Sequence, residues 1–167
     1  MPVTSSGSAK VTLPADDQIL VTREFDAPKH LVYKAFTTPE LVKRWWHANR
    51  GEMTVAEIDL RVGGKWRYVM IADGGMEVGF HGEYREIVPN ERIVSTETFE
   101  GLPEGVSEED GTTVNTATFA EQDGRTTLTL LIQAPSKVTR DAIVDSGMEA
   151  GLQDALDNLE QVAVSLG

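Results

Sequence analysis

The side chains in this sequence that could carry out chemistry are its three histidines and two closely spaced pairs of charged residues. His30, His47 and His81 lie far apart in the chain, and neither a cysteine nor an HExxH motif accompanies them. Zinc and related metals need several such ligands at one point, and this spacing does not supply them. We therefore expect no metal site.

The charged pairs are Glu57 with Asp59 and Glu83 with Arg85, each spaced two residues apart. That spacing puts both members on one face of a strand, where two carboxylates buried together could act as acid and base. A solvated face or a cross-strand ion pair accounts for the same pattern with fewer assumptions. The GxSxG motif of hydrolases and the phosphate-binding loop are both absent. We therefore predict no catalytic residue and no cofactor, and leave enzymatic activity undecided.

The charge and composition of the chain limit its partners. It has 27 acidic and 15 basic residues, for a formal net charge of -12, so no basic stripe is available to neutralise phosphates. No apolar run approaches the roughly 20 residues of a membrane span either. We expect neither a nucleic acid nor a membrane as partner. The absence of cysteine fits a reducing compartment, and we expect a cytoplasmic monomer or homodimer.

Residues 63–98 are the stretch around which the other elements can be arranged. Trp66, Tyr68 and Met70 recur at the period of two that is expected of a strand with one buried face. Asp73-Gly74-Gly75 then supplies a hairpin turn, and a later Pro-Asn pair supplies a second turn. The stretch therefore predicts three consecutive antiparallel strands.

Further elements precede and follow this meander. Residues 19–25 predict a strand that runs directly into two short helices, because Asp26-Ala27-Pro28 and Thr38-Pro39 are helix-start signals. Residues 53–60 predict another strand, and residues 114–134 predict a second hairpin. The sheet is thus expected to have about seven strands.

The last predicted element is the longest. Beyond Pro135, apolar residues recur at intervals of three and four with acidic residues between them, which predicts one amphipathic helix of roughly 28 residues. Gly147 and Gly151 would each cost this helix about 1 kcal/mol relative to alanine, so we expect them to serve a close approach or to leave space. We interpret residues 1–18 as a disordered tail and residues 19–167 as a single domain.

Six short motifs in this order are specific as a set. They are Arg23 to Pro28, Thr38-Pro39-Glu40 followed by Trp45-Trp46, Asp59 to Gly64, Gly82-Glu83-Tyr84, Pro89 to Val94, and Gly147 to Gly151. The chain thereby resembles the START-like (SRPBCC) superfamily, and in detail its activator of Hsp90 ATPase homologue 1-like branch. The resemblance implies an α+β helix-grip fold. In this fold a curved antiparallel sheet wraps around a long C-terminal helix, two short helices follow the first strand, and an apolar cavity lies between sheet and helix. It does not imply one activity, because one fold hosts many functions.

Such a cavity would be lined by aromatic and methionine side chains of the meander and of the last helix. Any one of them could simply be core, but a single helix over a strongly curved sheet does not fill the concave side, and apolar ligands bind in clefts of this kind. Methionine suits an adaptable pocket because it is flexible and polarizable. His47 would lie near the cavity mouth. The ligand-binding residues predicted on this basis are Trp46, Trp66, Tyr68, Met70, Phe80, Phe119, Met148 and Leu152.

Two functions of different classes follow from the resemblance. The first is binding of a small hydrophobic or aromatic molecule, uncharged or weakly polar, in the cavity. The second is a co-chaperone-like interaction that stimulates the Hsp90 ATPase; the family name implies it, but the chain offers no basic face for an acidic chaperone. A third is a cofactor-free cyclase or hydrolase, which would need a polar pair pointing into the cavity. A small hydrophobic molecule is thus the expected partner, with a chaperone as the alternative.

Overall fold

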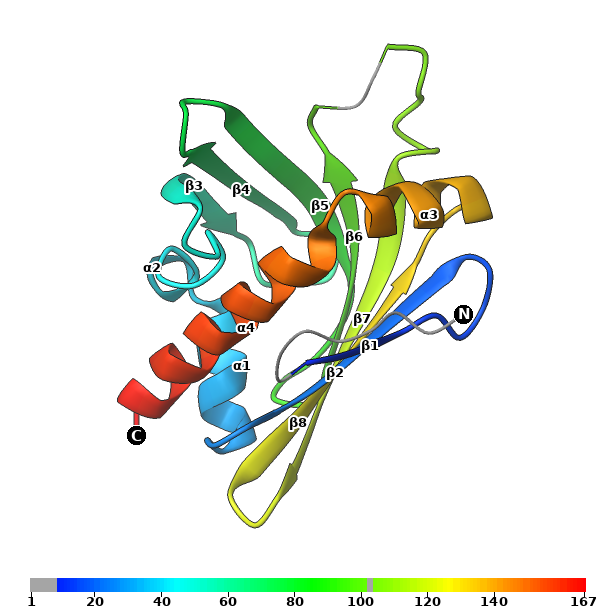
Figure 1. Ribbon diagram of the computed structural model, residues 1–167. Coiled ribbons are helices and arrows are strands. Elements are labelled where there is room, and N and C mark those ends of the chain that lie inside the picture. The colour runs from blue at the N-terminus through cyan, green and yellow to red at the C-terminus, as the bar shows by residue number, and fades with distance from the viewer. Residues whose placement is uncertain (1–8, 102–103) are drawn as a thin grey trace.

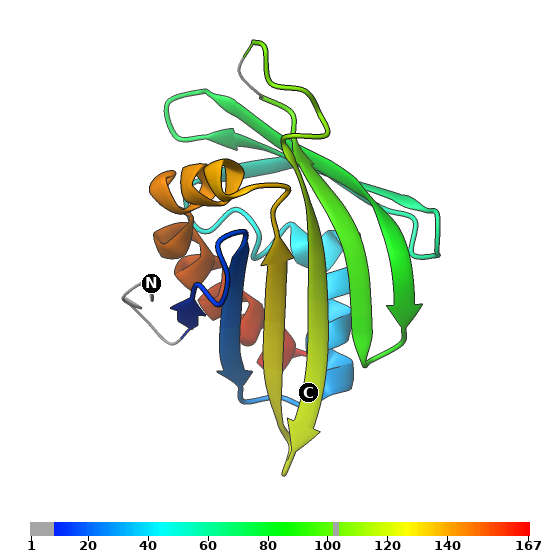
Figure 2. The same cartoon turned by 90° about the vertical axis from the view of Figure 1, so that its right-hand side faces the viewer.

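The computed structural model describes residues 9–101 and 104–167, which form one curved antiparallel sheet that wraps around helices (Figures 1 and 2). The strands are β1 (Lys10–Thr12), β2 (Gln18–Phe25), β3 (Gly51–Ile58), β4 (Lys65–Ala72), β5 (Glu77–Val88), β6 (Arg92–Phe99), β7 (Thr112–Gln122) and β8 (Arg125–Gln133). Their order across the sheet is β1-β2-β8-β7-β6-β5-β4-β3. Strands β3 to β8 are therefore a continuous meander, and β2 joins it beside β8.

The helices are α1 (Lys29–Thr37), α2 (Pro39–Val42), α3 (Lys137–Asp145) and α4 (Met148–Ser165). Both views place α1 and α4 on the same, concave side of the sheet. Phe119 of β7 marks this covered face, since its ring meets Tyr33 and Phe36 of α1 at centroid distances of 5.5 and 5.6 Å. The predicted α+β helix-grip fold is confirmed, with two short helices after the first long strand.

The sheet has an eighth strand, because β1 forms within the segment predicted to be a disordered tail. Lys10–Thr12 pair with residues 20–22 of β2. The backbone of Ala9 is also held by α4: its N–H donates to Gln153 Oε1 at 2.9 Å, and Gln153 Nε2 donates to its carbonyl at 2.7 Å. A three-residue strand carries no readable alternation, which is why the sequence did not reveal it. Residues 1–8 of the predicted tail lie outside the described residues.

The predicted C-terminal helix of roughly 28 residues is wrong in one respect, because the structure divides it into α3 and α4. The break falls at Gly147, whose φ of +84° is the left-handed conformation that ends a helix and that glycine adopts without strain. Helix α4 alone has 18 residues. Neither Gly147 nor Gly151 serves a close approach, since a Cβ at either position would meet no heavy atom of the described residues within 4 Å.

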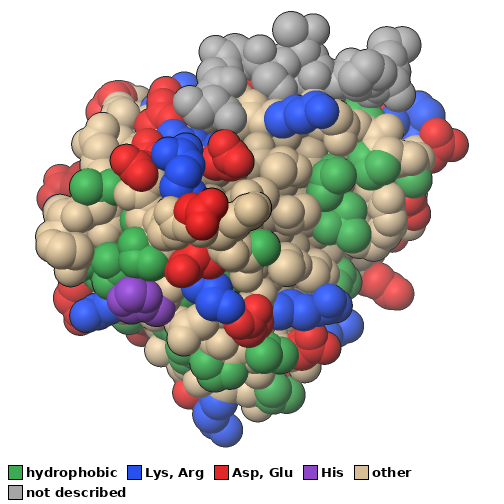
Figure 3. All heavy atoms as spheres, turned by 90° about the horizontal axis from the view of Figure 1, so that it is seen from below, with side chains coloured by type: hydrophobic (Ala, Val, Ile, Leu, Met, Phe, Trp, Pro, Cys, Tyr) green, Lys and Arg blue, Asp and Glu red, His purple; other side chains and the backbone are tan. Residues whose placement is uncertain are grey.

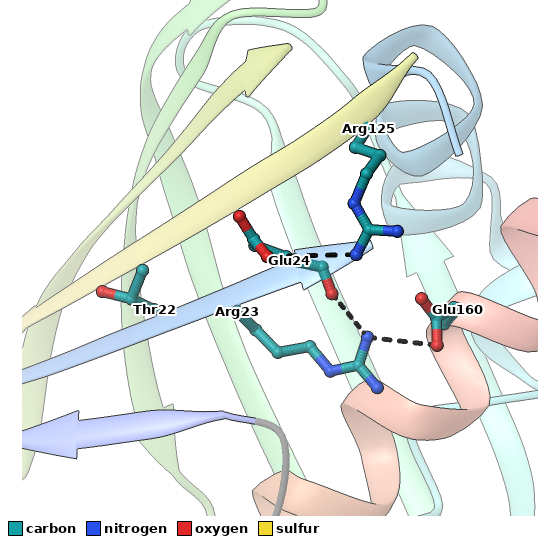
Figure 4. A pocket seen from close by; sticks show the side chains of 5 residues that line it. All are labelled: Thr22, Arg23, Glu24, Arg125 and Glu160. Atoms are coloured by element: carbon teal, nitrogen blue, oxygen red, sulfur yellow. Dashed lines mark hydrogen bonds and ion pairs between the residues drawn. The ribbon is translucent and has the colours of Figure 1, made fainter. Parts of the chain in front are cut away.

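Strand β2 carries one charged residue on its buried face. Val21 and Phe25 are buried as expected from the alternation, and Arg23 between them is only 4% exposed. Its guanidinium forms ion pairs with Asp157 at 2.6 Å and Glu160 at 3.4 Å, both on α4. Figure 4 shows Arg23 reaching from β2 towards Glu160. These ion pairs fix the C-terminal half of α4 to β2.

Candidate functional site

The aromatic side chains of β4 and β5 meet on the helix-covered face of the sheet. Tyr68 of β4 pairs with Phe80 of β5 in the strand register. The ring of Trp46, which follows α2, reaches both at centroid distances of 5.6 Å, and Trp66 lies 4.8 Å from Tyr68. The structure thus brings four of the eight residues predicted to bind a ligand into contact. We call these four residues the aromatic cluster.

Trp66 is the most firmly held member of the aromatic cluster. Its indole N–H donates to the backbone carbonyl of Thr96 at 3.1 Å, and its side chain is 6% exposed. Gly82 makes room for the ring, because a Cβ at that position would lie 2.6 Å from the indole nitrogen and 1.8 Å from the Thr96 oxygen. Any larger residue at Gly82 would therefore displace the indole or the neighbouring strand.

The other four predicted residues are distributed around this cluster. Met70 lies two positions further along β4 and is buried. Met148 and Leu152 lie on α4 and are half-buried against the core. Phe119 is 1% exposed and packs beneath α1, apart from the aromatic cluster. The structure therefore gives Phe119 a place in the sealed core under α1.

A row of polar side chains that no sequence pattern singled out crosses the same face. Tyr68, Tyr84, Glu97 and Asn115 come one each from β4, β5, β6 and β7, and we call them the polar row. Asn115 Nδ2 donates to Glu97 Oε1 at 3.4 Å, and the hydroxyl of Thr113 donates to Asn115 Oδ1 at 2.9 Å. The amide of Asn115 is thereby turned with its N–H groups towards the carboxyl.

The polar row lies where charge is disfavoured. Burial raises the pKa of Tyr68 well above its usual value, and the charges of Tyr84 and Glu97 add to the rise. Burial likewise raises the pKa of Tyr84 and of Glu97, although the hydrogen bond from Asn115 opposes the rise at Glu97. Desolvation therefore dominates, and Tyr68 lies within electrostatic reach of both neighbours.

Two hollows open to solvent where β2 meets the C-terminal half of α4. One is lined by Thr22, Arg23, Glu24, Arg125 and Glu160 (Figure 4), and the other by Asp26, Glu160, Gln161, Val164 and Ser165. None of the predicted ligand-binding residues and no member of the polar row borders either hollow. The wall of the first hollow is mostly charged or polar, so that hollow does not suit an apolar ligand.

The charged pairs considered for acid–base chemistry are exposed. Asp59 pairs with Arg61 at 2.8 Å, and Glu83 pairs with Lys65 at 2.7 Å. Glu57 is exposed on β3. These contacts agree with the interpretation of a solvated face with ion pairs. The two carboxylates of Glu57 and Asp59 are not buried together.

The three histidines do not converge on one point. His30 is exposed on α1, and the Nδ1 atom of His47 accepts a hydrogen bond from the backbone of Asn49 at 2.9 Å. His81 alternates with the aromatic cluster along β5 and contacts Glu100. Within residues 9–101 and 104–167, no three His, Cys, Asp or Glu side chains are placed to hold a metal ion.

Glu100 joins Arg67 and His81 in an ion cluster on the side of the sheet away from α4. Two nitrogens of Arg67 donate to the two carboxylate oxygens of Glu100, each at 2.9 Å, and His81 Nδ1 lies 3.0 Å from Glu100 Oε2. The hydrogen bonds from Arg67 lower the pKa of Glu100 to about 2; burial opposes this shift, and the hydrogen bond with His81 adds to it. A bidentate pair of this kind fastens the end of β6 to β4.

Replacement of Glu100 by glutamine is expected to make the stability of the protein less dependent on pH between about pH 2 and 7. Because the pKa of Glu100 is lower in the folded than in the unfolded chain, its contribution is present above about pH 4.5 and is lost as the pH falls towards 2. Urea unfolding should show Glu100→Gln less stable than wild type by about 1 kcal/mol at pH 7 and by much less near pH 2.5, after allowance for solvent screening. Glu104→Gln, which alters an exposed carboxyl nearby, is the control. An equal loss of unfolding free energy for Glu100→Gln at both pH values would contradict a lowered pKa of Glu100 in the folded protein.

Comparison with known proteins gives a family model and several solved structures. The model described as activator of Hsp90 ATPase homolog 1-like protein matches residues 26–163. A crystal structure of a Rhodobacter sphaeroides protein is 23% identical with a TM-score of 0.84, covering 95% of this chain and 99% of that one. A Chromobacterium violaceum protein is 29% identical, with a TM-score of 0.76 and coverage of 89% and 98%. An Aeromonas hydrophila protein described as AHSA1-like is 21% identical, with a TM-score of 0.63 and coverage of 89% and 94%.

The comparison with curated proteins found no match. In the part of the chain that the structure describes, no helix is long and apolar enough to span a membrane. On the face seen in Figure 3, Lys and Arg side chains lie among Asp and Glu side chains and do not gather into one basic patch. That face therefore offers no continuous surface of one sign to a highly charged partner.

Proposed function

The chain belongs to the activator of Hsp90 ATPase homologue 1-like family, and on that premise we propose that it binds a small hydrophobic or aromatic molecule between the sheet and α4. The observation that carries the proposal is the incomplete burial of apolar side chains on the covered face. Trp46, Phe80, Met148 and Leu152 pack against the core, yet each is only half-buried. An apolar ligand would cover this remaining apolar surface.

Gly151 supports the same position for the ligand. It lies three residues after Met148 and four before the buried Ala155, so the three share one side of α4. A Cβ at Gly151 would meet no heavy atom of the described residues within 4 Å. Space beside this turn of the helix is thus free of described protein atoms.

Apolar contact alone is sufficient for useful affinity. A ligand of drug size gains roughly 0.3 kcal/mol per heavy atom, so a ligand of about 25 heavy atoms would reach a micromolar dissociation constant without a charged contact. No metal or organic cofactor enters the proposal.

Leucine at Gly151 is expected to remove binding. Apolar aromatic compounds should quench or shift the tryptophan emission of the wild-type protein and raise its Tm, because Trp46 and Trp66 border the proposed site. Gly151→Leu should weaken binding by about tenfold or more, since the new side chain occupies the ligand's space. Ala150→Leu, which adds the same side chain at an exposed position of α4, should bind as wild type does. A broad panel that changes neither emission nor Tm would count against the proposal.

The family description favours one alternative, an interaction with an Hsp90-type chaperone. Its test is the rate of ATP turnover by the cognate chaperone with and without this protein. Stimulation that survives Gly151→Leu would assign that role to the protein independently of any ligand. A cofactor-free cyclase or hydrolase is the third candidate, and a product formed from a bound compound would favour it.

A further inference from the structure

We propose that the polar row formed by Tyr68, Tyr84, Glu97 and Asn115 is a polar anchor, which selects apolar ligands that carry one hydroxyl or amino group. The inference rests on the proposed function, because the polar row lies on the same covered face as the aromatic cluster. It goes further by stating the ligand's chemistry: an apolar body with a single hydrogen-bond donor, and no carboxylate.

Strand register brings Tyr84, Glu97 and Asn115 together. Ser95 pairs with Tyr84 on one side and with Asn115 on the other, so these three residues lie side by side across β5, β6 and β7. Glu97 is two positions along β6 from Ser95 and therefore on the same face. Tyr68 belongs to the aromatic cluster on β4, which places the anchor directly beside the apolar surface that the ligand body would cover.

Polar atoms of this row have unused hydrogen-bonding capacity. Tyr68 is 9% exposed and Tyr84 is 6% exposed, yet neither hydroxyl has a hydrogen-bond partner among the described residues. Among those residues, the side-chain atom that is both sealed from solvent and unpartnered is Arg23 Nε, so both hydroxyl oxygens remain accessible to water. Water therefore satisfies these hydroxyls in the free protein, and a ligand on the covered face that carries one polar group can take the place of that water.

Glu97 determines which chemistry fits. Only its Oε1 accepts a hydrogen bond, from Asn115, and no lysine or arginine of the described residues pairs with it. A carboxyl in such surroundings is stabilised by a hydroxyl donor or, more strongly, by an ammonium group. A ligand carboxylate would instead bring a second acidic group into surroundings where burial already disfavours charge. The anchor therefore accepts donors and rejects anions.

A set of four naphthalene probes that differ in one substituent tests this selectivity. Isothermal titration calorimetry would compare methylnaphthalene, naphthylmethanol, naphthylmethylamine and naphthoic acid with the wild-type protein. The alcohol and the amine are expected to bind about tenfold to a hundredfold more tightly than the methyl compound, the range of a hydrogen bond to a charged group. Naphthoic acid should bind more weakly than the methyl compound. Equal affinity of all four probes would overturn the anchor.

Variants of the anchor assign the selectivity to its atoms. Glu97→Met, which keeps the length of the side chain and removes its oxygens, should abolish the preference for alcohol and amine and leave the methyl compound unchanged. Glu97→Gln should weaken binding of the amine far more than binding of the alcohol. The comparison therefore identifies which donor the site prefers. Tyr68→Phe removes one hydroxyl with little risk to the fold. Glu83→Gln, a carboxyl on β5 paired with Lys65, is the matched control.

The outcomes separate the anchor from the binding proposal. If the methyl compound binds and Glu97→Met leaves every affinity unchanged, the ligand site stands and the anchor is wrong. If no probe binds to the wild-type protein, the anchor and the ligand site fail together. Retention of the preference in both Glu97→Met and Tyr68→Phe would likewise overturn the anchor.

Discussion

A chain that ends at Ala134 is expected to be unfolded or aggregated. The deleted helices supply Leu156, Leu159 and Val162, which are at most 3% exposed. Burial of a large apolar side chain contributes about 1.5 to 3 kcal/mol, so these three alone approach the 5 to 15 kcal/mol that stabilises a typical domain. The deletion would also expose the concave face of the sheet to water. Circular dichroism and size-exclusion chromatography would measure the loss.

A milder pair of variants tests the same point in the full chain. Leu159→Ala, at a fully buried position, is expected to lower the free energy of unfolding by about 2 to 5 kcal/mol. Val164→Ala, at an exposed position of the same helix, should stay within about 0.5 kcal/mol of wild type. A soluble truncated chain that melts cooperatively would contradict the role given to α4.

The second large effect is expected where α4 meets β2. Asp157→Asn combined with Glu160→Gln would leave the guanidinium of Arg23 buried without a counter-charge, and its Nε already has no partner. Stranding a buried charge costs about 3 to 5 kcal/mol. We expect the lower end of that range, because Asp157 is 50% exposed and water can partly take its place.

Removal of the arginine should cost less than removal of its partners. Arg23→Met keeps an apolar side chain at this buried position and leaves two carboxylates that water can reach. Urea unfolding would compare the free energies of unfolding of the two variants. Glu83→Gln, at an exposed ion pair, is the control and is expected to change stability by at most about 1 kcal/mol. An Arg23→Met variant that is less stable than the double variant would show that the contact acts through packing and not through charge.

The parts of the fold that the sequence predicted are those with long periodic signals. The alternation of Trp66, Tyr68 and Met70 gave β4 its buried face, and the turn at residues 73–75 gave the β4–β5 hairpin. Proline and threonine at the start of α2 marked the second helix. In each case local preference and tertiary packing agree, which is the condition under which sequence patterns are reliable.

The parts that it missed depend on contacts distant in sequence. Strand β1 is held by the backbone of β2 and by Gln153, which lies 144 residues from Ala9. The sequence shows a glycine at position 147, but it does not show that this glycine adopts the left-handed conformation that ends α3. Glu97 could have been placed by alternation from Ile93, which is buried on the same strand. Its proximity to Asn115 follows only from the register of β6 and β7.

The most direct test of the central claim is a crystal structure of the protein purified from its own host. We predict electron density of a small molecule between the aromatic cluster and α4, beside Gly151, with a polar group within hydrogen-bond distance of Glu97, Tyr68 or Tyr84. Side chains that fill this space completely, with hydroxyls of Tyr68 and Tyr84 bonded to protein atoms, would contradict the claim that the fold holds a ligand there.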